Sequence, residues 1–352
     1  MANHRNRLQT RQLTIRDIAR EAGLSVATIS RVLNGQPDVA PETRESVLRL
    51  VRERGYSINR SARALSGART GLVGVTLPHI HASYFATLAS SVAEALYEHD
   101  MRAILCPTLH QHDREVGLLE RLMGGTTDGA VLMLPSESNE ELHALEESGY
   151  PFVVLDPKTP LDAGIASVSA ANTPGAVSAT EHLLALGHRR IGAITGPAGW
   201  CATEERLVGY RAALAGAGVP PDRALEVESD FEIEGGIRAA ARLLDGPDPP
   251  TAIFAFNDNL AVGAMRAARE RGLRLPQDLS VVGFDDSDLA PFVSPALTTV
   301  RLPLGEMGRM AVSLLSRLTD GRTVEALRVE LAARLVVRES TGSASPPGSL
   351  HH

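Results

Sequence analysis

The side chains of this sequence best suited to bind a small molecule stand at the ends of apolar, strand-like runs. Asp285 lies at the end of the run LSVVGFDD, Asp156 ends FVVLD, and Asn257 follows the run FAF. In an open α/β sheet, ligands bind at the carboxyl ends of the strands, so these three residues are candidates for one site. A ligand held between two lobes needs polar groups from both sides and an apolar or aromatic wall. The sequence therefore predicts a ligand-binding cleft.

No pattern typical of an enzyme accompanies these residues. The sequence lacks a Gly-x-Ser-x-Gly elbow, a phosphate-binding glycine loop and a His/Cys cluster with metal-ligand spacing. Its two cysteines, Cys106 and Cys201, are far apart, which is typical of a reducing compartment. No apolar run is long enough to span a bilayer, and the N-terminus is polar and basic. We expect a cytoplasmic protein that is not an enzyme, with no metal, cofactor or membrane partner.

The charge of the chain is divided unevenly along its length. Residues 1–70 hold 13 Arg against 6 Asp and Glu, whereas the remainder holds 22 basic and 36 acidic residues. The overall charge of −7 therefore combines a basic N-terminal part with an acidic body. A basic module of this kind is typical of a segment that binds a polyanion, and we expect nucleic acid as the partner.

The segment 14–34, TIRDIAREAGLSVATISRVLN, predicts two short helices joined by a turn at Gly23. Apolar residues of the first helix repeat at i, i+3, i+4 and i+7, and Ser25 is placed to cap the second. Such a pair forms a helix-turn-helix that fits a DNA major groove. The alternative is an ordinary helical hairpin within a core. The second helix has a small, polar and basic outer face made by Ala27, Arg31 and Asn34.

The remainder of the chain alternates strand-like apolar runs with helical patterns. This alternation predicts parallel sheets covered by helices on both faces. Roughly 270 residues of it exceed one ordinary domain, so we expect two similar lobes. The predicted strands are Leu72–Leu77, Arg102–Cys106, Gly129–Leu134, Phe152–Leu155, Arg190–Thr195, Ala252–Phe256 and Leu279–Phe284.

Residues 14–65 resemble the N-terminal region of the lactose-repressor (LacI/GalR) family of bacterial transcription regulators. The runs SVATISRVLNG, PETRESV and GY…N…ARAL match this family at matching spacing. The body is similar to the family's effector domain, which is related to periplasmic sugar-binding proteins, through EHLLALGHRRIGAITGP, ERLVGYRAAL, AIFAFNDNLAVGAMRA and DLSVVGFDD. The resemblance implies an all-α helix-turn-helix head followed by a two-lobed α/β effector domain.

The resemblance also implies the domain boundaries. We expect a helix-turn-helix domain at 1–58, a hinge helix and linker at 59–71, a two-lobed ligand-binding and dimerisation domain at 72–337, and a disordered tail at 338–352. The tail is rich in Gly, Ser and Pro and carries no leucine heptads, which favours a dimer over a tetramer.

The resemblance implies a set of DNA-binding residues in the recognition helix and the hinge. The recognition helix reads bases through its first turn and through Arg31, which can donate two hydrogen bonds to a guanine edge. Hydroxyl and amide side chains bond phosphates, and Leu65 of the hinge enters the minor groove. The alternatives are that Arg31 is a solvated surface residue and that Leu65 packs on the body. The full set is Ser25, Val26, Ala27, Thr28, Arg31, Asn34, Asn59, Ala62 and Leu65.

The resemblance likewise implies effector-binding residues in the body. Asp285 and Arg206 match an aspartate and an arginine that the family uses for its ligands, and Phe231 matches an aromatic residue that stacks on them. The only tryptophan, Trp200, would suit stacking on a sugar ring. The alternatives are structural: a helix cap, an ion pair and core packing. The full set is Tyr84, Phe85, Asp156, Trp200, Arg206, Phe231, Asn257 and Asp285.

Together, these observations predict a regulator rather than a transporter or an enzyme. The resemblance implies a homodimer that binds a palindromic operator, most simply as a repressor, under allosteric control by a small molecule. Carboxylates, an arginine and aromatic residues fit a mono- or oligosaccharide best, with a purine corepressor as the alternative. A sugar-binding transport component would fit the body alone, but the basic head argues against it.

Overall fold

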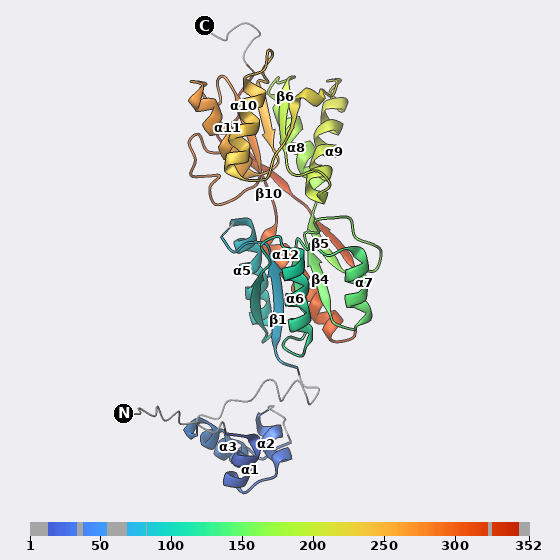
Figure 1. Cartoon of the computed structure of the whole chain (residues 1–352). Coiled ribbons are helices and arrows are strands. Elements are labelled where there is room, and N and C mark those ends of the chain that lie inside the picture. Colours follow the sequence, from blue (N-terminus) through green and yellow to red (C-terminus); the bar gives the residue numbers. More distant parts are fainter. Residues whose placement is uncertain (1–12, 34–37, 55–68, 82, 323–325, 345–352) are drawn as a thin grey trace, which may run out of the picture. The chain divides into compact units, whose positions relative to one another are not determined.

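The computed structural model describes residues 13–33, 38–54, 69–81, 83–322 and 326–344 (Figure 1). The chain divides into two compact units, Met1–Thr70 and Gly71–His352, which we call the head and the body. Most of the predicted hinge lies outside the described residues. So do four of the predicted DNA-binding residues, Asn34, Asn59, Ala62 and Leu65.

The described residues of the head form three helices, α1 (Ile15–Ala22), α2 (Val26–Leu33) and α3 (Pro41–Glu53). Thr14 caps α1, because its hydroxyl accepts from the N–H of Asp17 and the Asp17 carboxylate accepts from the N–H of Thr14. Gly23 ends α1 with a φ of 65°, a conformation that glycine adopts without strain. The small core of the head consists of Ile18, Ala19, Ile29, Val32 and Val47.

The first half of the body is built on a parallel sheet of six strands, in the order β11-β5-β4-β3-β1-β2. We call this sheet and its helices the N-terminal lobe. Helices α5 (Ser83–Glu98) and α12 (Leu304–Thr319) pack on one face, and α6 (His112–Met123) and α7 (Asn139–Glu147) on the other. The strands are β1 (Leu72–Leu77), β2 (Arg102–Pro107), β3 (Ala130–Met133), β4 (Phe152–Leu155), β5 (Ser167–Ala170) and β11 (Arg328–Leu331).

The second sheet repeats this arrangement in the order β12-β10-β9-β8-β6-β7, and we call this half the C-terminal lobe. Helices α8 (Asn172–Ala185) and α9 (Cys201–Gly216) cover one face, and α10 (Ile233–Leu244) and α11 (Asp258–Glu270) cover the other. A 3-10 turn, η1 (Arg223–Leu225), precedes β7. The strands are β6 (Ile191–Thr195), β7 (Glu226–Glu228), β8 (Ala252–Ala255), β9 (Ser280–Asp285), β10 (Thr298–Arg301) and β12 (Arg334–Val336), of which only β12 is antiparallel.

The chain passes between the two lobes three times, after β5, after β10 and after β11 (Figure 1). Central strands of both sheets are buried on both sides, as expected for parallel strands between two helical layers. The helix-turn-helix head and the two-lobed α/β body confirm the predicted fold class. In the described parts of the chain, the helices are too short or too polar to cross a membrane.

The prediction of a disordered tail from residue 338 is wrong for residues 338–344. The side chain of Ser340 is fully buried, where its hydroxyl donates to the carbonyl of Val281. The guanidinium of Arg338 pairs with Asp286, and the N–H of Ala344 donates to the carbonyl of Leu186. Composition alone suggested disorder, but these backbone and side-chain bonds fix the segment on the C-terminal lobe. The remaining residues, 345–352, lie outside the described part.

Candidate functional site

The start of helix α2 is fixed within the head by two hydroxyl groups. The Ser25 hydroxyl accepts from the N–H of Thr28 at 3.1 Å, and the two hydroxyl oxygens are 2.9 Å apart. This cap satisfies a backbone donor that the helix leaves free. Ile29 and Val32 bury the opposite side of α2 in the core. The rest of α2 is therefore oriented outward by the core of the head.

The outward face of α2 carries the predicted base-reading residues. Val26 is 41% exposed although it is apolar, and Ala27 and Arg31 are exposed as well. The Arg31 guanidinium is 3.6 Å from the Asp38 carboxylate, and both side chains are more than half exposed. Exposed ion pairs of this kind contribute little free energy, so DNA can compete for Arg31. An exposed apolar and basic helix face is suited to bases and phosphates in a major groove.

The body contains an open cavity whose lining encloses about 910 Å³ of space, part of which is continuous with the solvent. It lies at the carboxyl ends of strands from both sheets, as parallel α/β sheets favour. All eight residues predicted for the effector site line this one cavity. The complete lining is His79, Ser83, Tyr84, Phe85, His110, Leu134 and Asp156 from the N-terminal lobe, and Trp200, Ala202, Arg206, Asp230, Phe231, Glu232, Asn257, Asp258, Asn259, Asp285 and Ser287 from the C-terminal lobe.

Arg206, on α9, is held rigidly at the base of this cavity and is only 5% exposed. Its Nε donates to Oδ1 of Asn172 at 2.9 Å, and a terminal nitrogen donates to the carbonyl of Phe256. The guanidinium carbon lies 3.9 Å from the centre of the Phe284 ring, a cation–π contact. Its other terminal nitrogen is 3.6 Å from Oδ1 of Asp285. A buried guanidinium fixed in this way is a preorganised donor for a ligand.

Asp285 and Asp286 form a turn of two consecutive residues with positive φ, 109° and 55°. Such conformations are strained for residues other than glycine and are often found at functional sites. Burial raises the pKa of Asp285 well above its ordinary value, and Arg206 opposes this shift. The alternative that Asp285 caps a helix is not supported, since no helix begins after it before Pro303 in the described part of the chain.

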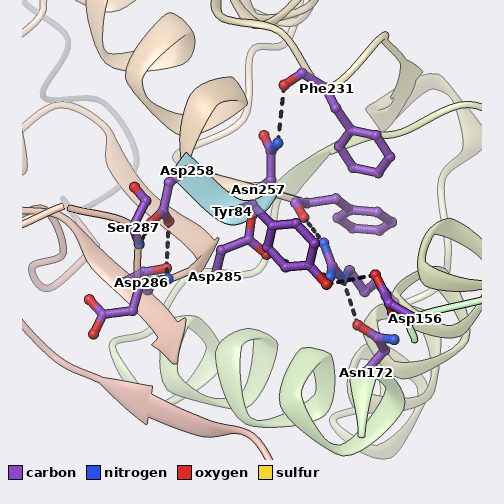
Figure 2. A network of polar contacts seen from close by, with 12 residues as sticks. Tyr84, Asp156, Asn172, Phe231, Asn257, Asp258, Asp285, Asp286 and Ser287 are labelled. Atoms are coloured by element: carbon purple, nitrogen blue, oxygen red, sulfur yellow. Dashed lines mark hydrogen bonds and ion pairs between the residues drawn. The ribbon is translucent and has the colours of Figure 1, made fainter. Parts of the chain in front are cut away.

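Another aspartate, the buried Asp258, supports this turn (Figure 2). Oδ1 of Asp258 accepts from the Thr299 hydroxyl and Oδ2 from the N–H of Ser287, both at 2.6 Å. Burial raises the pKa of Asp258 to about 6. Asp286 points away from Asp258 and pairs with Arg301 and with Arg338, the latter at 2.6 Å. The turn that presents Asp285 is thus tied to β10 and to the segment after β12.

In the N-terminal lobe, Tyr84 and Asp156 form the corresponding polar pair (Figure 2). The Tyr84 hydroxyl donates to Oδ2 of Asp156 at 2.6 Å, and Phe85 packs edge-on against the Tyr84 ring with centroids 5.2 Å apart. Burial raises the pKa of Asp156, while the bond from Tyr84 and the charge of Arg206 lower it. Tyr84 also has a raised pKa, because burial and the Asp156 charge disfavour its phenolate. This pair offers a ligand one carboxylate and one hydroxyl.

Asn257 and Phe231 lie together on the C-terminal side. Asn257 caps α11 by accepting from the N–H of Leu260 at 2.8 Å, and its Nδ2 donates to the carbonyl of Phe231 at 3.0 Å (Figure 2). The Phe231 backbone has a φ of 64°, and this bond supports it. Both polar atoms of Asn257 are therefore engaged with the protein. Asn257 thus supports the backbone of Phe231, and both residues line the cavity.

Trp200 lies where the two lobes meet. Its ring is 5.8 Å from that of Phe231 in its own lobe and 5.9 Å from that of His110 in the other. The ammonium group of Lys158 is 5.2 Å from the centre of the indole, and the N–H of Cys201 donates to the Lys158 carbonyl at 2.8 Å. These contacts cross the mouth of the cavity. Trp200 thus packs against residues of both lobes, and it also lines the cavity.

The sequence reasoning missed several residues of the cavity and its supports. His79, His110 and Leu134 each follow a strand of the first sheet, so the strand-end rule that identified Asp156 would have found them. Asp258 and Asn172 support the cavity through side-chain bonds that no sequence pattern reveals. In the described part of the chain, no group of three or more His, Cys, Asp or Glu is placed to hold a metal ion.

Comparison with known proteins identifies both units. Residues 14–59 match the model of the bacterial regulatory proteins of the lacI family, and residues 180–341 match the periplasmic binding protein-like domain. The HTH-type transcriptional regulator DegA of Bacillus subtilis is 36% identical over 334 residues, which cover 93% of this chain and 98% of DegA.

Two solved structures show the same architecture over nearly the whole chain. A complex of the transcriptional regulator CelR with cellobiose is 35% identical, has a TM-score of 0.72, and covers 93% of this chain and 99% of its own. The Lac repressor dimer bound to operator and the anti-inducer ONPF is 27% identical and has a TM-score of 0.83. The match covers 94% of this chain and 99% of the Lac repressor chain. Regulators of this kind bind operator DNA and small-molecule effectors and act as dimers. The chain therefore belongs to the lacI family of bacterial regulatory proteins, and it is a DNA-binding transcriptional regulator and not an enzyme.

Proposed function

We propose that this regulator is a homodimeric repressor of a two-fold symmetric operator and that a sugar bound in the cavity of the body controls its affinity for DNA. The observation that carries the proposal is the cavity itself, which gathers all eight predicted effector residues from both lobes. The two-fold symmetry of a dimer implies a palindromic operator. The free thiols of Cys106 and Cys201 fit a cytoplasmic location, where DNA is also found.

The chemistry of the cavity supports a polyhydroxylated effector. Asp156 and Asp285 supply carboxylates from opposite lobes, and Arg206 supplies a fixed donor between them. Hydroxyl groups both donate and accept, so they can satisfy all three residues at once. Aromatic rings of Trp200 and Phe231 offer apolar walls for the faces of a sugar ring. A purine corepressor is the competing ligand, since Arg206 and the aromatic walls would also suit a planar base.

The mechanism follows from a ligand that contacts both lobes. Binding to Asp156 on one side and to Arg206 and Asp285 on the other favours one angle between the lobes. The chain crosses between lobes after β5, β10 and β11, so a change of angle is taken up at these three crossings. The changed angle alters how the hinge segments meet operator DNA. Such coupling changes affinity only as far as the ligand distinguishes the two states, typically by roughly 5- to 150-fold.

The test is a DNA-binding titration of the full chain against a library of palindromic sites. We would repeat it with a panel of mono- and disaccharides and of purine bases, at fixed ionic strength because phosphate contacts make affinity salt-dependent. We expect selection of one two-fold symmetric site and a change of its affinity by one sugar.

Arg31→Ala should weaken binding to that site by roughly 5- to 150-fold and relax its sequence preference.

Each result of the titration has a definite meaning. A purine base that changes operator affinity, with no effect of any sugar, would replace the sugar by a purine effector. A single half-site bound as tightly as the palindrome would contradict the homodimeric operator complex. Unchanged sequence preference in Arg31→Ala would remove Arg31 from base recognition.

A further inference from the structure

Two buried glutamates in the N-terminal lobe have no role in the effector chemistry described above. Glu115 lies in the first turn of α6 and is 1% exposed, and Glu137 lies between β3 and α7 and is 5% exposed. Buried carboxylates are costly unless cations or hydrogen bonds compensate them. Oε1 of Glu115 and both carboxyl oxygens of Glu137 have no hydrogen-bond donor among the described residues. Such a pair requires an explanation.

Among the described residues, neither Glu115 nor Glu137 forms an ion pair with a basic side chain. Oε2 of Glu115 accepts from the N–H of Ser136, the residue before Glu137, at 3.1 Å, and each of the two carboxyl groups shifts the pKa of the other. Thr76 on β1 has a fully buried hydroxyl, and it lies opposite Cys106 on the neighbouring strand β2. No arginine or lysine accompanies these groups in the ion pairs of the described residues.

The charged and titratable neighbours act in opposite directions on the two carboxyls. His112, at the start of α6, lowers the pKa of Glu115, as do the Ser136 N–H and Thr76, although burial raises it overall. The pKa of Glu137 is raised to about 8. Burial is the largest cause, and the charges of Glu115 and Glu141 contribute to the same rise. His112 itself pairs with Glu141 at 2.9 Å. One proton held between the two carboxyl groups would relieve their repulsion and give Oε1 of Glu115 and one oxygen of Glu137 a hydrogen-bond partner.

The pair joins two loops that reach the effector cavity. Glu115 begins the helix that follows the loop with His110, and Glu137 lies three residues after Leu134. Both His110 and Leu134 line the cavity and both have positive φ, 55° and 51°. Residues in this conformation need support from their surroundings. A bond between Glu115 and Glu137 joins α6, which follows the loop with His110, to the segment that follows Leu134.

We propose that Glu115 and Glu137 share one proton and that this bond positions the loops bearing His110 and Leu134 at the cavity. They are positioning residues, because neither lines the cavity itself. Loss of the shared proton leaves two adjacent carboxylates, whose repulsion separates the loops. The consequence for effector affinity rests on the proposed function. The shared proton and the position of the loops do not rest on the proposed function, and both can be measured without an effector.

Trp200 provides a direct readout of the loop position. It is the only tryptophan of the chain, and its ring is 5.9 Å from that of His110. We would titrate the fluorescence of the full chain between pH 6 and about pH 9.5 in the wild type, in Glu137→Gln and in Glu115→Gln. An amide donates a hydrogen bond to the remaining carboxylate at every pH, so each variant keeps the bond without the proton. Glu140→Gln, an exposed glutamate of α7, is the matched control.

We expect a fluorescence transition near pH 8 in the wild type and in Glu140→Gln, and its absence in both pair variants. Thermal unfolding supplies the second readout. The folded-state pKa of Glu137 lies above the unfolded value, so its contribution to stability is complete below about pH 4.5 and is lost as pH rises through about 8. The unfolding temperature of the wild type should therefore fall over this interval relative to Glu137→Gln.

Two results would overturn the proposal. Identical fluorescence and unfolding profiles in the wild type and both pair variants would show that no proton is shared. A rise in the wild-type unfolding temperature on adding Mg²⁺ or Ca²⁺, absent in Glu137→Gln, would show that a cation rather than a proton joins the carboxylates. Either result would leave the sugar-controlled repressor untouched, because that proposal is tested by the operator titration. Failure of the operator titration would likewise leave the fluorescence transition interpretable.

Discussion

The two lobes use the same topological positions to present a carboxylate, but they compensate it differently. Asp156 follows β4 and Asp285 ends β9, which is the equivalent strand in the other sheet. In each lobe the helix after the first strand supplies the donor, Tyr84 from α5 and Arg206 from α9. One carboxylate therefore meets a neutral hydroxyl and the other a guanidinium. Both aspartates have positive φ and are partly buried.

A similar contrast holds for the acids behind the cavity. Asp258, after β8, accepts bonds from Thr299 and Ser287, whereas Glu137, after the equivalent strand β3, has no donor in the described part of the chain. Among the described residues, Asp258 is thus held by two hydrogen-bond donors, whereas Glu137 depends on the proton that we propose it shares with Glu115.

The largest expected effect comes from removing the charge in the C-terminal lobe. Arg206→Met leaves Asp285, whose side chain is 13% exposed, without its cation, which should lower the free energy of unfolding by about 3–5 kcal/mol. Denaturant unfolding measures this loss, and titration calorimetry should show no effector binding. In the double variant with Asp285→Asn, stability should largely return while binding stays absent. A double variant as unstable as Arg206→Met alone would show that Arg206 stabilises the lobe by other contacts.

The next effect concerns the pH response of the C-terminal lobe. The folded-state pKa of Asp258 is about 6, above its ordinary 3.8, so its contribution to stability is present below about pH 4 and lost as pH rises through 6. The free energy of unfolding of Asp258→Asn relative to wild type should change by on the order of 2–3 kcal/mol over this interval. Chemical unfolding at several pH values checks it. A parallel dependence in both proteins would mean that Asp258 is ionised as in the unfolded chain.

The smallest effect is expected in the N-terminal lobe. Tyr84→Phe removes the one hydroxyl that donates to Asp156 and should cost about 1–2 kcal/mol in stability, because a buried acceptor loses its donor. Effector affinity should fall roughly tenfold, less than in Arg206→Met, since a neutral donor is lost rather than a charge. Calorimetry on the two variants under one condition compares them directly. Equal losses of affinity would contradict the difference between the lobes.

Much of the fold and of the cavity follows from sequence pattern. Apolar periodicity predicts the helices of the head, and alternation of strands and helices predicts the parallel sheets. The rule that ligands bind at strand ends predicts Asp156, Asn257 and Asp285, because it depends only on local order along the chain. Arg206, in the middle of a helix, came from the family resemblance.

The supports of the cavity could not be predicted in this way. Asn172 meets Arg206, and Arg338 meets Asp286, across separations that no local pattern encodes. For the same reason, composition suggested disorder where residues 338–344 are held by partners far away in the sequence. The Glu115–Glu137 pair looks like two surface glutamates in the sequence. Only burial distinguishes it.

The most direct test of whether this cavity is the effector site measures operator binding by Asp285→Asn. The measurement is made with and without the sugar that changes the operator affinity of the wild type. Asp248→Asn, whose side chain is 76% exposed on the same lobe, is the matched control. Without sugar, we expect Asp285→Asn to bind the operator as tightly as the wild type does, which would also show that the variant is folded. We expect its operator affinity not to change when the sugar is added. Asp248→Asn should keep both. An Asp285→Asn protein that binds the operator and still answers to the sugar as the wild type does would contradict the role of this cavity.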